Sequence, residues 1–303
     1  MRILITGGTG FFGKHLIDLL SNSNYDILCY GRSKEKIERI FGDTVTAVDT
    51  LNIDFDYIIH AACPTASDEL STKSVETISA IYDLTKESLE AAKRNKARML
   101  FLSTMEVYGQ INGMVKEEDL GSICLDKPRS GYAEGKRLAE LLCTCYREEY
   151  GVDVVVARLS QLFGLGSEKN DNRFFNYALR CLAKNENIKL STDGTNYHNS
   201  IYVKDAAQIC LALLLSGVHG TYNVTDPSNA MAIRDLCDRM IEIVESDKRI
   251  EYVNGDCSKF RAKSACIISN KKLLEVFPNV RYTAFEDSIR ETYEYIKRSL
   301  ADS

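Results

Sequence analysis

A glycine-spaced turn directly after the first apolar run is the feature that most constrains how this chain folds. Residues 3–5 read as a short buried strand, and residues 11–20 read as the helix that it feeds. A lone glycine triplet is often only a turn, but between a strand and a helix it is typical of a dinucleotide-binding unit. The glycines then permit a tight turn, close approach of a phosphate, and packing of helix on strand. The pyrophosphate contacts are expected from Gly7, Thr9, Gly10, Phe11, Phe12 and Gly13.

Strands and helices alternate along the chain, which predicts an α/β fold with a Rossmann-type doubly wound parallel sheet. The predicted strands are 2–5, 25–30, 57–61, 98–103, 153–158 and 221–224. The predicted helices are 11–21, 33–40, 73–95, 131–149, 173–185, 204–216, 232–246 and 284–299. Residues 49–56 leave little room for a helix, so we expect the sheet to lack one crossover helix there.

A tyrosine and a lysine four residues apart predict acid/base chemistry. Tyr132 and Lys136 lie on one face of the helix that runs to about residue 149. The ammonium, together with a nicotinamide ribose, would lower the pKa of the phenol from about 10 towards neutrality and make it a general acid/base. Ser103 and Thr104 end the strand upstream, where a third partner is needed. The alternative is an ordinary surface Tyr and Lys.

At this point the chain resembles an extended short-chain dehydrogenase/reductase of the nucleotide-sugar epimerase/dehydratase branch. The resemblance covers residues 1 to about 225. It rests on the glycine turn and on 56–62, 103–109, 128–132, 157–159, 163–164 and 201–205. It implies that Thr104 orients the substrate hydroxyl, that Tyr132 is the acid/base, and that Lys136 holds the ribose. It also places Ala61 and Ala62 beside the cofactor.

The resemblance further implies two domains and a dimer. The dinucleotide-binding domain would comprise residues 1–165 plus 199–218, and a smaller C-terminal α/β substrate-binding domain would comprise 166–198 plus 219–303. Relatives pair two helices into an intersubunit bundle, here 73–95 and 131–149. The second carries an apolar stripe that includes Leu138 and Leu141, so a homodimer is expected. The alternative is that this stripe faces its own sheet.

The charge, the apolar segments and the cysteines of the chain limit which partners and which cellular compartment it is expected to have. A net charge of −5 argues against a nucleic-acid surface, and no segment reaches the roughly 20 apolar residues of a membrane span. The N-terminus enters a strand with no signal peptide. Ten scattered cysteines form neither a zinc set nor an evident disulfide framework. We therefore expect a cytoplasmic protein with free thiols, without metal, nucleic acid or membrane as partners.

Cofactor choice depends on the end of the second strand, where Gly31, Arg32 and Ser33 follow with no acid. A carboxylate there would bind the ribose of NAD, whereas an arginine accommodates the 2′-phosphate of NADP. Arg32 can clamp that phosphate with two hydrogen bonds, helped by the Ser33 hydroxyl. The sequence favours NADP. NAD remains possible if Arg32 is only a solvated residue at a helix start.

The substrate is predicted both from residues that match the family's motifs and from residues that differ from them. The residues around Glu106 resemble UDP-glucuronate decarboxylases and sugar-nucleotide 4,6-dehydratases, in which this Glu acts as a base or positions the hexose. Met105 stands where many dehydratases carry an acidic Asp, which counts against Asp-dependent dehydration. Gln161, His198 and Lys263 replace the expected Asn, Arg and Arg, and the last change makes decarboxylation doubtful. The expected substrate contacts are Cys63, Thr65, Ser67, Ser103, Met105, Gln161, Arg173, His198 and Lys263.

Three functions follow from these residues. The first is an NAD(P)-dependent enzyme that oxidises a nucleotide-diphosphate sugar at C4 to a 4-keto sugar, as an epimerase, dehydratase or decarboxylase, with Glu106 acting beside the ketone. The second is an NADPH-dependent reductase of a 4-keto-6-deoxy nucleotide sugar. The third is a catalytically silent cofactor-binding regulator. Intact Thr104, Tyr132 and Lys136 argue against the third.

Overall fold

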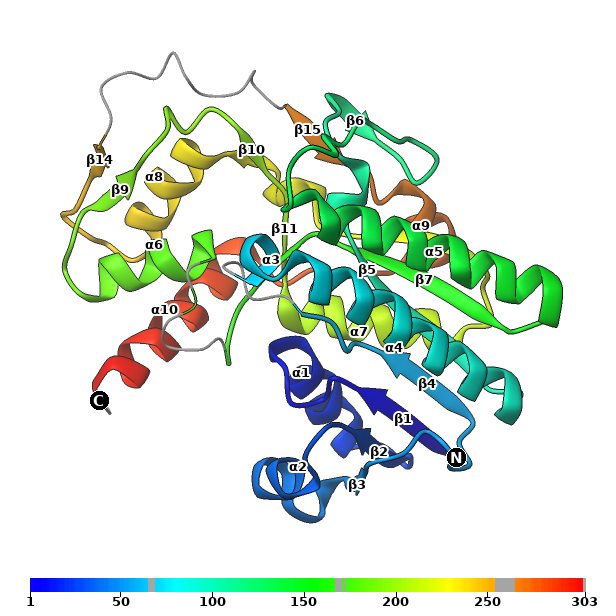
Figure 1. Ribbon diagram of the computed structural model, residues 1–303. Coiled ribbons are helices and arrows are strands. Elements are labelled where there is room, and N and C mark those ends of the chain that lie inside the picture. The colour runs from blue at the N-terminus through cyan, green and yellow to red at the C-terminus, as the bar shows by residue number, and fades with distance from the viewer. Residues whose placement is uncertain (65–68, 167–170, 172, 254–264, 302–303) are drawn as a thin grey trace. The chain divides into compact units, whose positions relative to one another are not determined.

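A parallel sheet of seven strands organises the first of two units in this computed structural model, which describes residues 1–64, 69–166, 171, 173–253 and 265–301. The strand order is β12-β7-β5-β4-β1-β2-β3 (Figure 1). The strands are β1 (Arg2–Thr6), β2 (Asp26–Tyr30), β3 (Thr46–Val48), β4 (Tyr57–His60), β5 (Arg98–Thr104), β7 (Val154–Leu159) and β12 (Gly220–Val224). The predicted fold class is confirmed.

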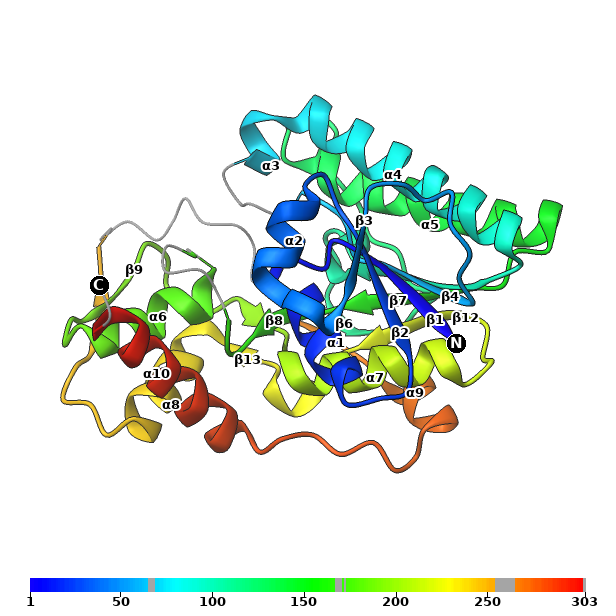
Figure 2. The same ribbon diagram turned by 90° about the horizontal axis from the view of Figure 1, so that it is seen from below.

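Helices cover both faces of this sheet. Two long neighbours, α4 and α5, lie side by side on one face, and α1 and α7 lie on the other (Figure 2). The helices are α1 (Phe11–Ser21), α2 (Lys34–Phe41), α3 (Glu69–Thr72), α4 (Ser74–Asn95), α5 (Ser130–Tyr150) and α7 (Val203–Leu215). The strands in the middle of the sheet are almost wholly buried, because apolar side chains from both faces meet helices.

The two compact units differ in their bounds from the predicted domains. Unit 1 comprises Met1–Gly109, Leu120–Leu159 and Ala207–Val224, and unit 2 comprises Gln110–Asp119, Ser160–Ala206 and Thr225–Ser303. Strand β12, expected in the second domain, pairs with β7 in the sheet of unit 1. The division of cofactor and substrate binding between the two parts remains a prediction.

Unit 2 combines helices with short strand pairs. The strands pair as β8 with β11, β10 with β13, β9 with β14, and β6 with β15. They are β6 (Gly113–Val115), β8 (Gln161–Phe163), β9 (Ile188–Leu190), β10 (Tyr197–His198), β11 (Ser200–Tyr202), β13 (Met231–Ala232), β14 (Ile250–Tyr252) and β15 (Cys266–Ile268). The helices are α6 (Phe174–Ala183), α8 (Ile233–Ile243), α9 (Lys271–Val276) and α10 (Phe285–Ala301). Stacked rings of Phe163 and Phe175, 4.2 Å apart, pack within this unit.

The connection from β3 to β4 contains no helix, as the sequence predicted. Instead, the C-terminal end of α4 holds it through side chains: Arg94 donates to the carbonyl of Leu51, and Asn95 donates to that of Ile53 at 3.1 Å. A hollow of about 650 Å³ lies between this connection and α4, with Tyr30 among its lining residues.

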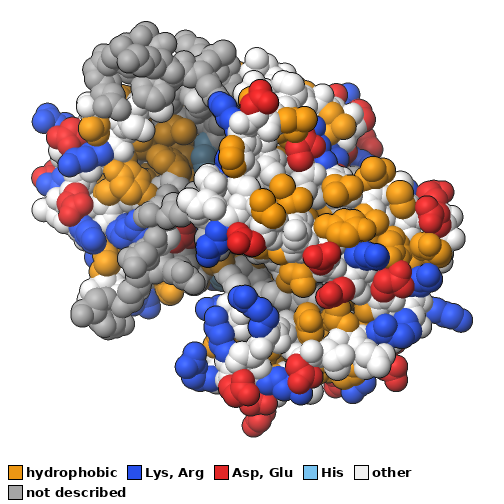
Figure 3. All heavy atoms as spheres, viewed as in Figure 1, with side chains coloured by type: hydrophobic (Ala, Val, Ile, Leu, Met, Phe, Trp, Pro, Cys, Tyr) orange, Lys and Arg blue, Asp and Glu red, His pale blue; other side chains and the backbone are white. Residues whose placement is uncertain are grey.

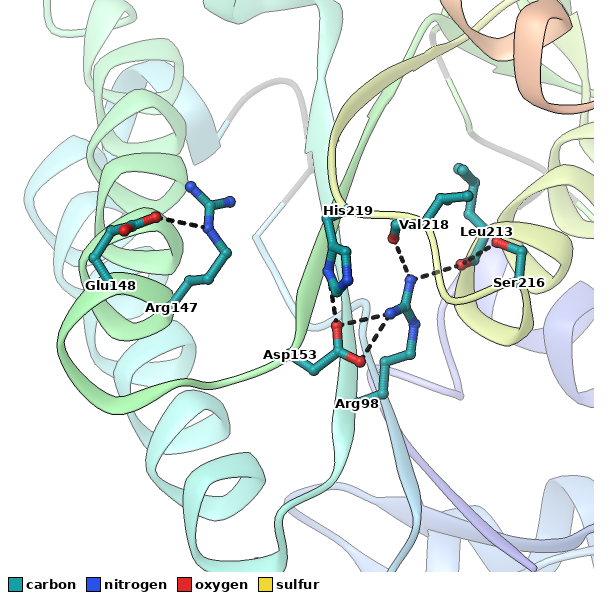
Figure 4. Close-up of polar contacts among 8 residues, drawn as sticks. All are labelled: Arg98, Arg147, Glu148, Asp153, Leu213, Ser216, Val218 and His219. Carbon is teal, nitrogen blue, oxygen red and sulfur yellow. Dashed lines mark hydrogen bonds and ion pairs between the residues drawn. The ribbon is translucent and has the colours of Figure 1, made fainter.

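An arginine anchors the start of β5 to its surroundings (Figure 4). The buried Arg98 pairs with Asp153 at 2.7 Å, and it also donates to the carbonyls of Leu213 and Val218. His219 lies 3.2 Å from the same carboxylate. These contacts lie at the amino end of β5, whereas ligands of parallel sheets bind at the carboxyl ends. We therefore assign them a structural role.

A buried histidine ends β4 inside unit 1. Its Nδ1 lies 3.0 Å from the hydroxyl of Thr6 and 2.9 Å from that of Ser88, and its Nε2 lies 3.3 Å from that of Thr85. The imidazole of His60 also stacks on Phe101 at 5.7 Å. Burial lowers the pKa of His60 from 6.5 to about 3, so the ring stays neutral in the folded protein.

This histidine makes stability depend on pH. In the unfolded chain His60 binds a proton below about pH 6.5, whereas in the folded protein it stays neutral down to about pH 3. Protonation therefore favours the unfolded chain, and the free energy of unfolding should fall as the pH falls through that window. One such group contributes a slope of up to about 1.4 kcal/mol per pH unit. Urea unfolding of His60→Gln across this window should show a shallower slope than the wild type. Thr85→Val, which keeps the imidazole, should lower stability without changing the slope, and equal slopes for His60→Gln and wild type would contradict the assignment.

Candidate active site

The glycine turn packs tightly against the end of β4. Gly7 has a φ of +73°, and a Cβ there would lie 2.7 Å from the backbone of Ala61 and Ala62. A Cβ at Gly13 would lie 2.3 Å from the carbonyl oxygen of Gly7, and the N–H of Gly10 donates to that oxygen at 3.0 Å. Only glycine allows these approaches, so the turn packs directly on Ala61–Ala62, and contact of both with a cofactor remains a prediction.

The start of α1 suits an anion. Gly10 precedes the helix without a side-chain cap, and the first turn carries no acid. The first turn of α1 carries the positive end of the helix dipole. Thr9, in the turn itself, is partly exposed. The arrangement fits a pyrophosphate, and cofactor contact by these residues remains a prediction.

The end of β2 fits the predicted 2′-phosphate site only in part. Arg32 is exposed, whereas the Ser33 hydroxyl caps α2 by accepting from the N–H of Lys36 at 3.2 Å. The same hydroxyl donates to the carboxylate of Glu35 at 2.8 Å. Sequence reasoning overlooked this carboxylate, which lies two residues beyond Ser33. Gly31 lies beside β3, where its N–H faces the carbonyl of Val48 at 3.4 Å.

The three predicted catalytic side chains meet at the carboxyl end of β5. The hydroxyl of Thr104 lies close enough to the phenol of Tyr132 to lower its pKa, and it accepts from the N–H of Glu106 at 3.3 Å. Lys136, one turn further along α5, is buried and donates to the carbonyl of Leu102 at 2.8 Å. The structure therefore places the hydroxyl of Thr104 beside the phenol of Tyr132, with the ammonium of Lys136 at the end of the same strand, and their catalytic roles remain a prediction.

The electrostatics of the phenol differ from the simplest expectation. Burial raises the pKa of Tyr132 above its usual value, and the neighbouring Cys63 and Glu106 raise it further. The hydrogen bond from Thr104 and the charge of Arg129 lower it, but by less. The protein's residues alone do not bring the phenol towards neutrality. The predicted lowering also involved the nicotinamide ribose, so it remains a prediction for the complex.

Cys63 lies beside the catalytic lysine. Its thiol donates to the carbonyl of Pro64 at 3.4 Å. Burial raises the pKa of the thiol, which favours its neutral form, and the nearby ammonium of Lys136 lowers it by less. The contact of Cys63 with a substrate remains a prediction. Thr65 and Ser67 of the same loop lie outside the described residues.

Glu106 forms an ion pair that sequence reasoning missed. Its carboxylate lies 2.8 Å from the guanidinium of Arg129, and both side chains are about one third exposed. The guanidinium carbon lies 5.6 Å from the centre of the Tyr132 ring. The signal was present in the sequence, because Arg129 stands inside the matched motif 128–132. Met105 begins the short 3₁₀ helix that carries Glu106, and its side chain is half-buried.

Ser103 faces the interior rather than an open site. It is buried, and its hydroxyl donates to Glu140 of α5. Glu140 forms a nearly buried ion pair with Arg158 of β7 at 2.7 Å, and that guanidinium lies 4.9 Å from the ring of Tyr108. These contacts do not support the predicted substrate contact of Ser103, because its hydroxyl is engaged by the carboxylate.

Arg173 and His198, the expected cations of unit 2, are not available as free charges. Arg173 lies at the start of α6, where its Nε contacts the Asp171 carboxylate at 2.8 Å. The imidazole of His198 packs beside the rings of Phe174 and Phe175, whose centres lie 5.6 and 5.3 Å from its own. Burial lowers the pKa of His198 to about 4, so it is neutral at pH 7 and offers a ligand no fixed charge.

The remaining substrate predictions are placed only in part. Gln161 begins β8, its side chain is half-buried, and its N–H donates to the carbonyl of Asn199 at 3.0 Å. Lys263 lies outside the described residues.

Within the described ranges, no three His, Cys, Asp or Glu side chains gather to hold a metal ion. In that same part of the chain, no helix combines the length and apolar character needed to cross a membrane.

Comparison with known proteins supports the family that the motifs indicated. Residues 3–225 match the NAD dependent epimerase/dehydratase family. The chain is 30% identical to UDP-glucuronic acid decarboxylase 1 of Danio rerio, over 99% of this chain and 73% of the relative. It is 28% identical to UDP-glucuronic acid decarboxylase 6 of Arabidopsis thaliana, over 93% of this chain and 85% of the relative.

Solved structures share the fold. A UDP-N-acetylglucosamine 4-epimerase from Methanobrevibacter ruminantium superposes with a TM-score of 0.85 at 22% identity, covering 98% of each chain. A UDP-glucuronic acid 4-epimerase from Bacillus cereus, in complex with UDP-glucuronic acid and NAD, gives 0.82 at 22% identity, covering 99% of this chain and all of the other. The predicted class, an NAD-dependent enzyme of the nucleotide-sugar epimerase/dehydratase type, is confirmed at this level. The chain belongs to the NAD dependent epimerase/dehydratase family.

Proposed function

We propose that this enzyme oxidises the C4 hydroxyl of a nucleotide-diphosphate sugar through Thr104, Tyr132 and Lys136. The observation that carries the proposal is that the Thr104 hydroxyl lies beside the phenol of Tyr132, with buried Lys136 one turn along α5. Tyr132 as phenolate takes the proton of the C4 hydroxyl while the C4 hydride leaves, and Thr104 orients that hydroxyl. A bound nicotinamide dinucleotide supplies the hydride acceptor. The ammonium of Lys136 favours the phenolate form of Tyr132 that accepts this proton.

Glu106 is the group proposed to act beside the resulting ketone. It lies two residues beyond Thr104 on a short 3₁₀ helix, partly exposed, in the same part of unit 1 as Tyr132. A 4-keto group acidifies the neighbouring C–H, so a nearby carboxylate can remove that proton or assist loss of a C6 substituent. Met105 offers no acid for expelling a C6 hydroxyl. Epimerisation, or decarboxylation as in the named relatives, is therefore favoured over Asp-dependent dehydration.

A 4-keto-sugar reductase is the second candidate. It would use the same three catalytic residues but exchange NADPH in every cycle. The exposed Arg32 favours it, whereas Glu106 beside Tyr132 favours the first function. Dinucleotide that co-purifies near one per chain supports the internal redox cycle, whereas rapid exchange supports the reductase.

Tyr132→Phe should reduce turnover at least about 100-fold, because it removes the proton acceptor. The measurement is product formation from a panel that includes UDP-glucuronic acid and UDP-N-acetylglucosamine. Tyr146→Phe is the matched control: it lies on the same helix and loses a hydrogen bond to Glu90 that is remote from Thr104. Dinucleotide binding by Tyr132→Phe should remain. Undiminished turnover in this variant would overturn the proposed roles.

NADP is proposed as the preferred dinucleotide, supported by exposed Arg32 and by the absence of an acid in 31–33. Arg32→Ala should weaken NADPH binding about tenfold or more while leaving NADH nearly unchanged, because a charge-assisted hydrogen bond to the 2′-phosphate is lost. Exposed Arg39 on α2 provides the control Arg39→Ala. Removing the nearby carboxylate in Glu35→Gln should strengthen NADPH binding. Tighter binding of NADH than NADPH by the wild type would contradict the preference.

A homodimer through α4 and α5 is also proposed. Hydrophobic side chains gather over these two helices (Figure 3), and Leu138 and Leu141 are 44% and 59% exposed. An apolar stripe on neighbouring helices suits a four-helix interface. Leu141→Glu should shift the protein to monomer in analytical ultracentrifugation. Val253→Glu, at an exposed position of unit 2, should not. A monomeric wild type would overturn the proposal.

A cytoplasmic location is proposed for the same protein. The support is that Cys29, Cys143 and Cys210 are buried as free thiols, which suits a reducing compartment. Labelled protein found outside the cytoplasm would contradict it.

A further inference from the structure

Arg129 connects the two segments that carry the acid/base groups of the active site. It immediately precedes α5, which bears Tyr132, and its side chain reaches the 3₁₀ helix after β5, which bears Glu106. The guanidinium lies 2.8 Å from the Glu106 carboxylate, and its carbon lies 5.6 Å from the centre of the Tyr132 ring. One side chain thus touches both groups.

The backbones on either side of this contact are fixed. The N–H of Glu106 donates to the Thr104 hydroxyl, and its carbonyl accepts from Gly109 at 3.1 Å. Arg137 of α5 donates to the carbonyl of Val107 at 2.7 Å, which ties the 3₁₀ helix to α5. The Arg129–Glu106 ion pair is thus a further contact between two segments whose backbones are already held in place by these hydrogen bonds.

The charges around the phenol explain why the pair matters. The titratable groups that face Tyr132 are Cys63 after β4, Glu106, Arg129 and, one turn along α5, Lys136. Glu106 raises the pKa of Tyr132 and Arg129 lowers it. A carboxylate placed close enough to act on the sugar therefore hinders ionisation of the phenol, and a cation paired with it offsets that effect.

We propose that Arg129 is a positioning residue that holds the Glu106 carboxylate beside Tyr132 and cancels its charge there, so that both groups can be ionised together. This inference rests on the proposed function, in which Tyr132 as phenolate accepts a proton and Glu106 acts next to the ketone. The inference assigns a role to Arg129, which the proposed function does not include. Arg129 acts through Glu106 and Tyr132 and takes no proton itself.

The test is the pH profile of kcat for Arg129→Gln, Arg129→Lys, Glu106→Gln and the double variant Glu106→Gln/Arg129→Gln. Because oxidation needs the phenolate, activity rises with pH. Arg129→Gln should move the rising limb up by about one pH unit and lower kcat about tenfold at neutral pH. Arg129→Lys should restore part of both losses. Glu106→Gln should move the limb down, and the double variant should return it near the wild-type position.

The control is Arg147→Gln, which removes an ion pair of similar length, with Glu148 at 3.0 Å, from the far end of the same helix (Figure 4). It should leave the pH profile unchanged. An active wild type whose rising limb does not move in Arg129→Gln overturns this inference alone, because a merely structural pair would alter stability but not the limb. Wild-type protein that turns over no nucleotide sugar overturns the proposed function and this inference with it.

Discussion

The buried ion pair between Glu140 and Arg158 holds together the elements that carry the reactive groups. Removing two charges from water costs several kcal/mol each, so such a pair is tolerated only when its remaining hydrogen-bonding groups find partners. Ser103 supplies one for Glu140, and the ring of Tyr108 covers the guanidinium. Glu140 continues the stripe of Tyr132 and Lys136 at four-residue spacing, and its ion pair with Arg158 and its contact with Ser103 hold α5 against β7 and β5. The position of the phenol relative to Thr104 depends on that lock.

Much of unit 1 could be predicted from pattern because its backbone follows local rules. The strands are apolar runs, the glycines stand where only glycine fits, and helical spacing places Tyr132 and Lys136 on one face. The partners of side chains were harder to predict, since they come from distant segments. The hydroxyls of Ser103 and Thr104 both end β5, and the sequence does not show which of them faces the interior. The hydrogen bond from Ser103 to Glu140 of α5 shows that it is Ser103.

The predictions for unit 2 depended on charge, and charge depends on packing. A histidine in place of an arginine suggested a weak cation, but adjacent phenylalanines enclose the ring of His198 and keep it neutral. Arg173 retains its charge, yet Asp171, two residues earlier, already binds it. A motif match shows neither that the ring of His198 is buried nor that Arg173 is paired with a neighbouring carboxylate. Unit 2 was therefore less predictable from the sequence than unit 1.

The helix-free connection between β3 and β4 has a mechanical consequence. It must cross β2 and β1, and strands lie about 4.8 Å apart, so the lateral path alone is about 14 Å. It must also return from the carboxyl end of one strand to the amino end of another, a further distance of roughly 13 Å for a four-residue strand. Residues 49–56 reach at most about 29 Å when fully extended. Because these two displacements are at right angles, the straight path is only about 19 Å, which leaves roughly 10 Å to spare. One residue, which spans at most about 3.6 Å, could therefore be deleted without stretching the segment. Such a deletion would instead displace Leu51 and Ile53 from the side chains of α4 that hold them.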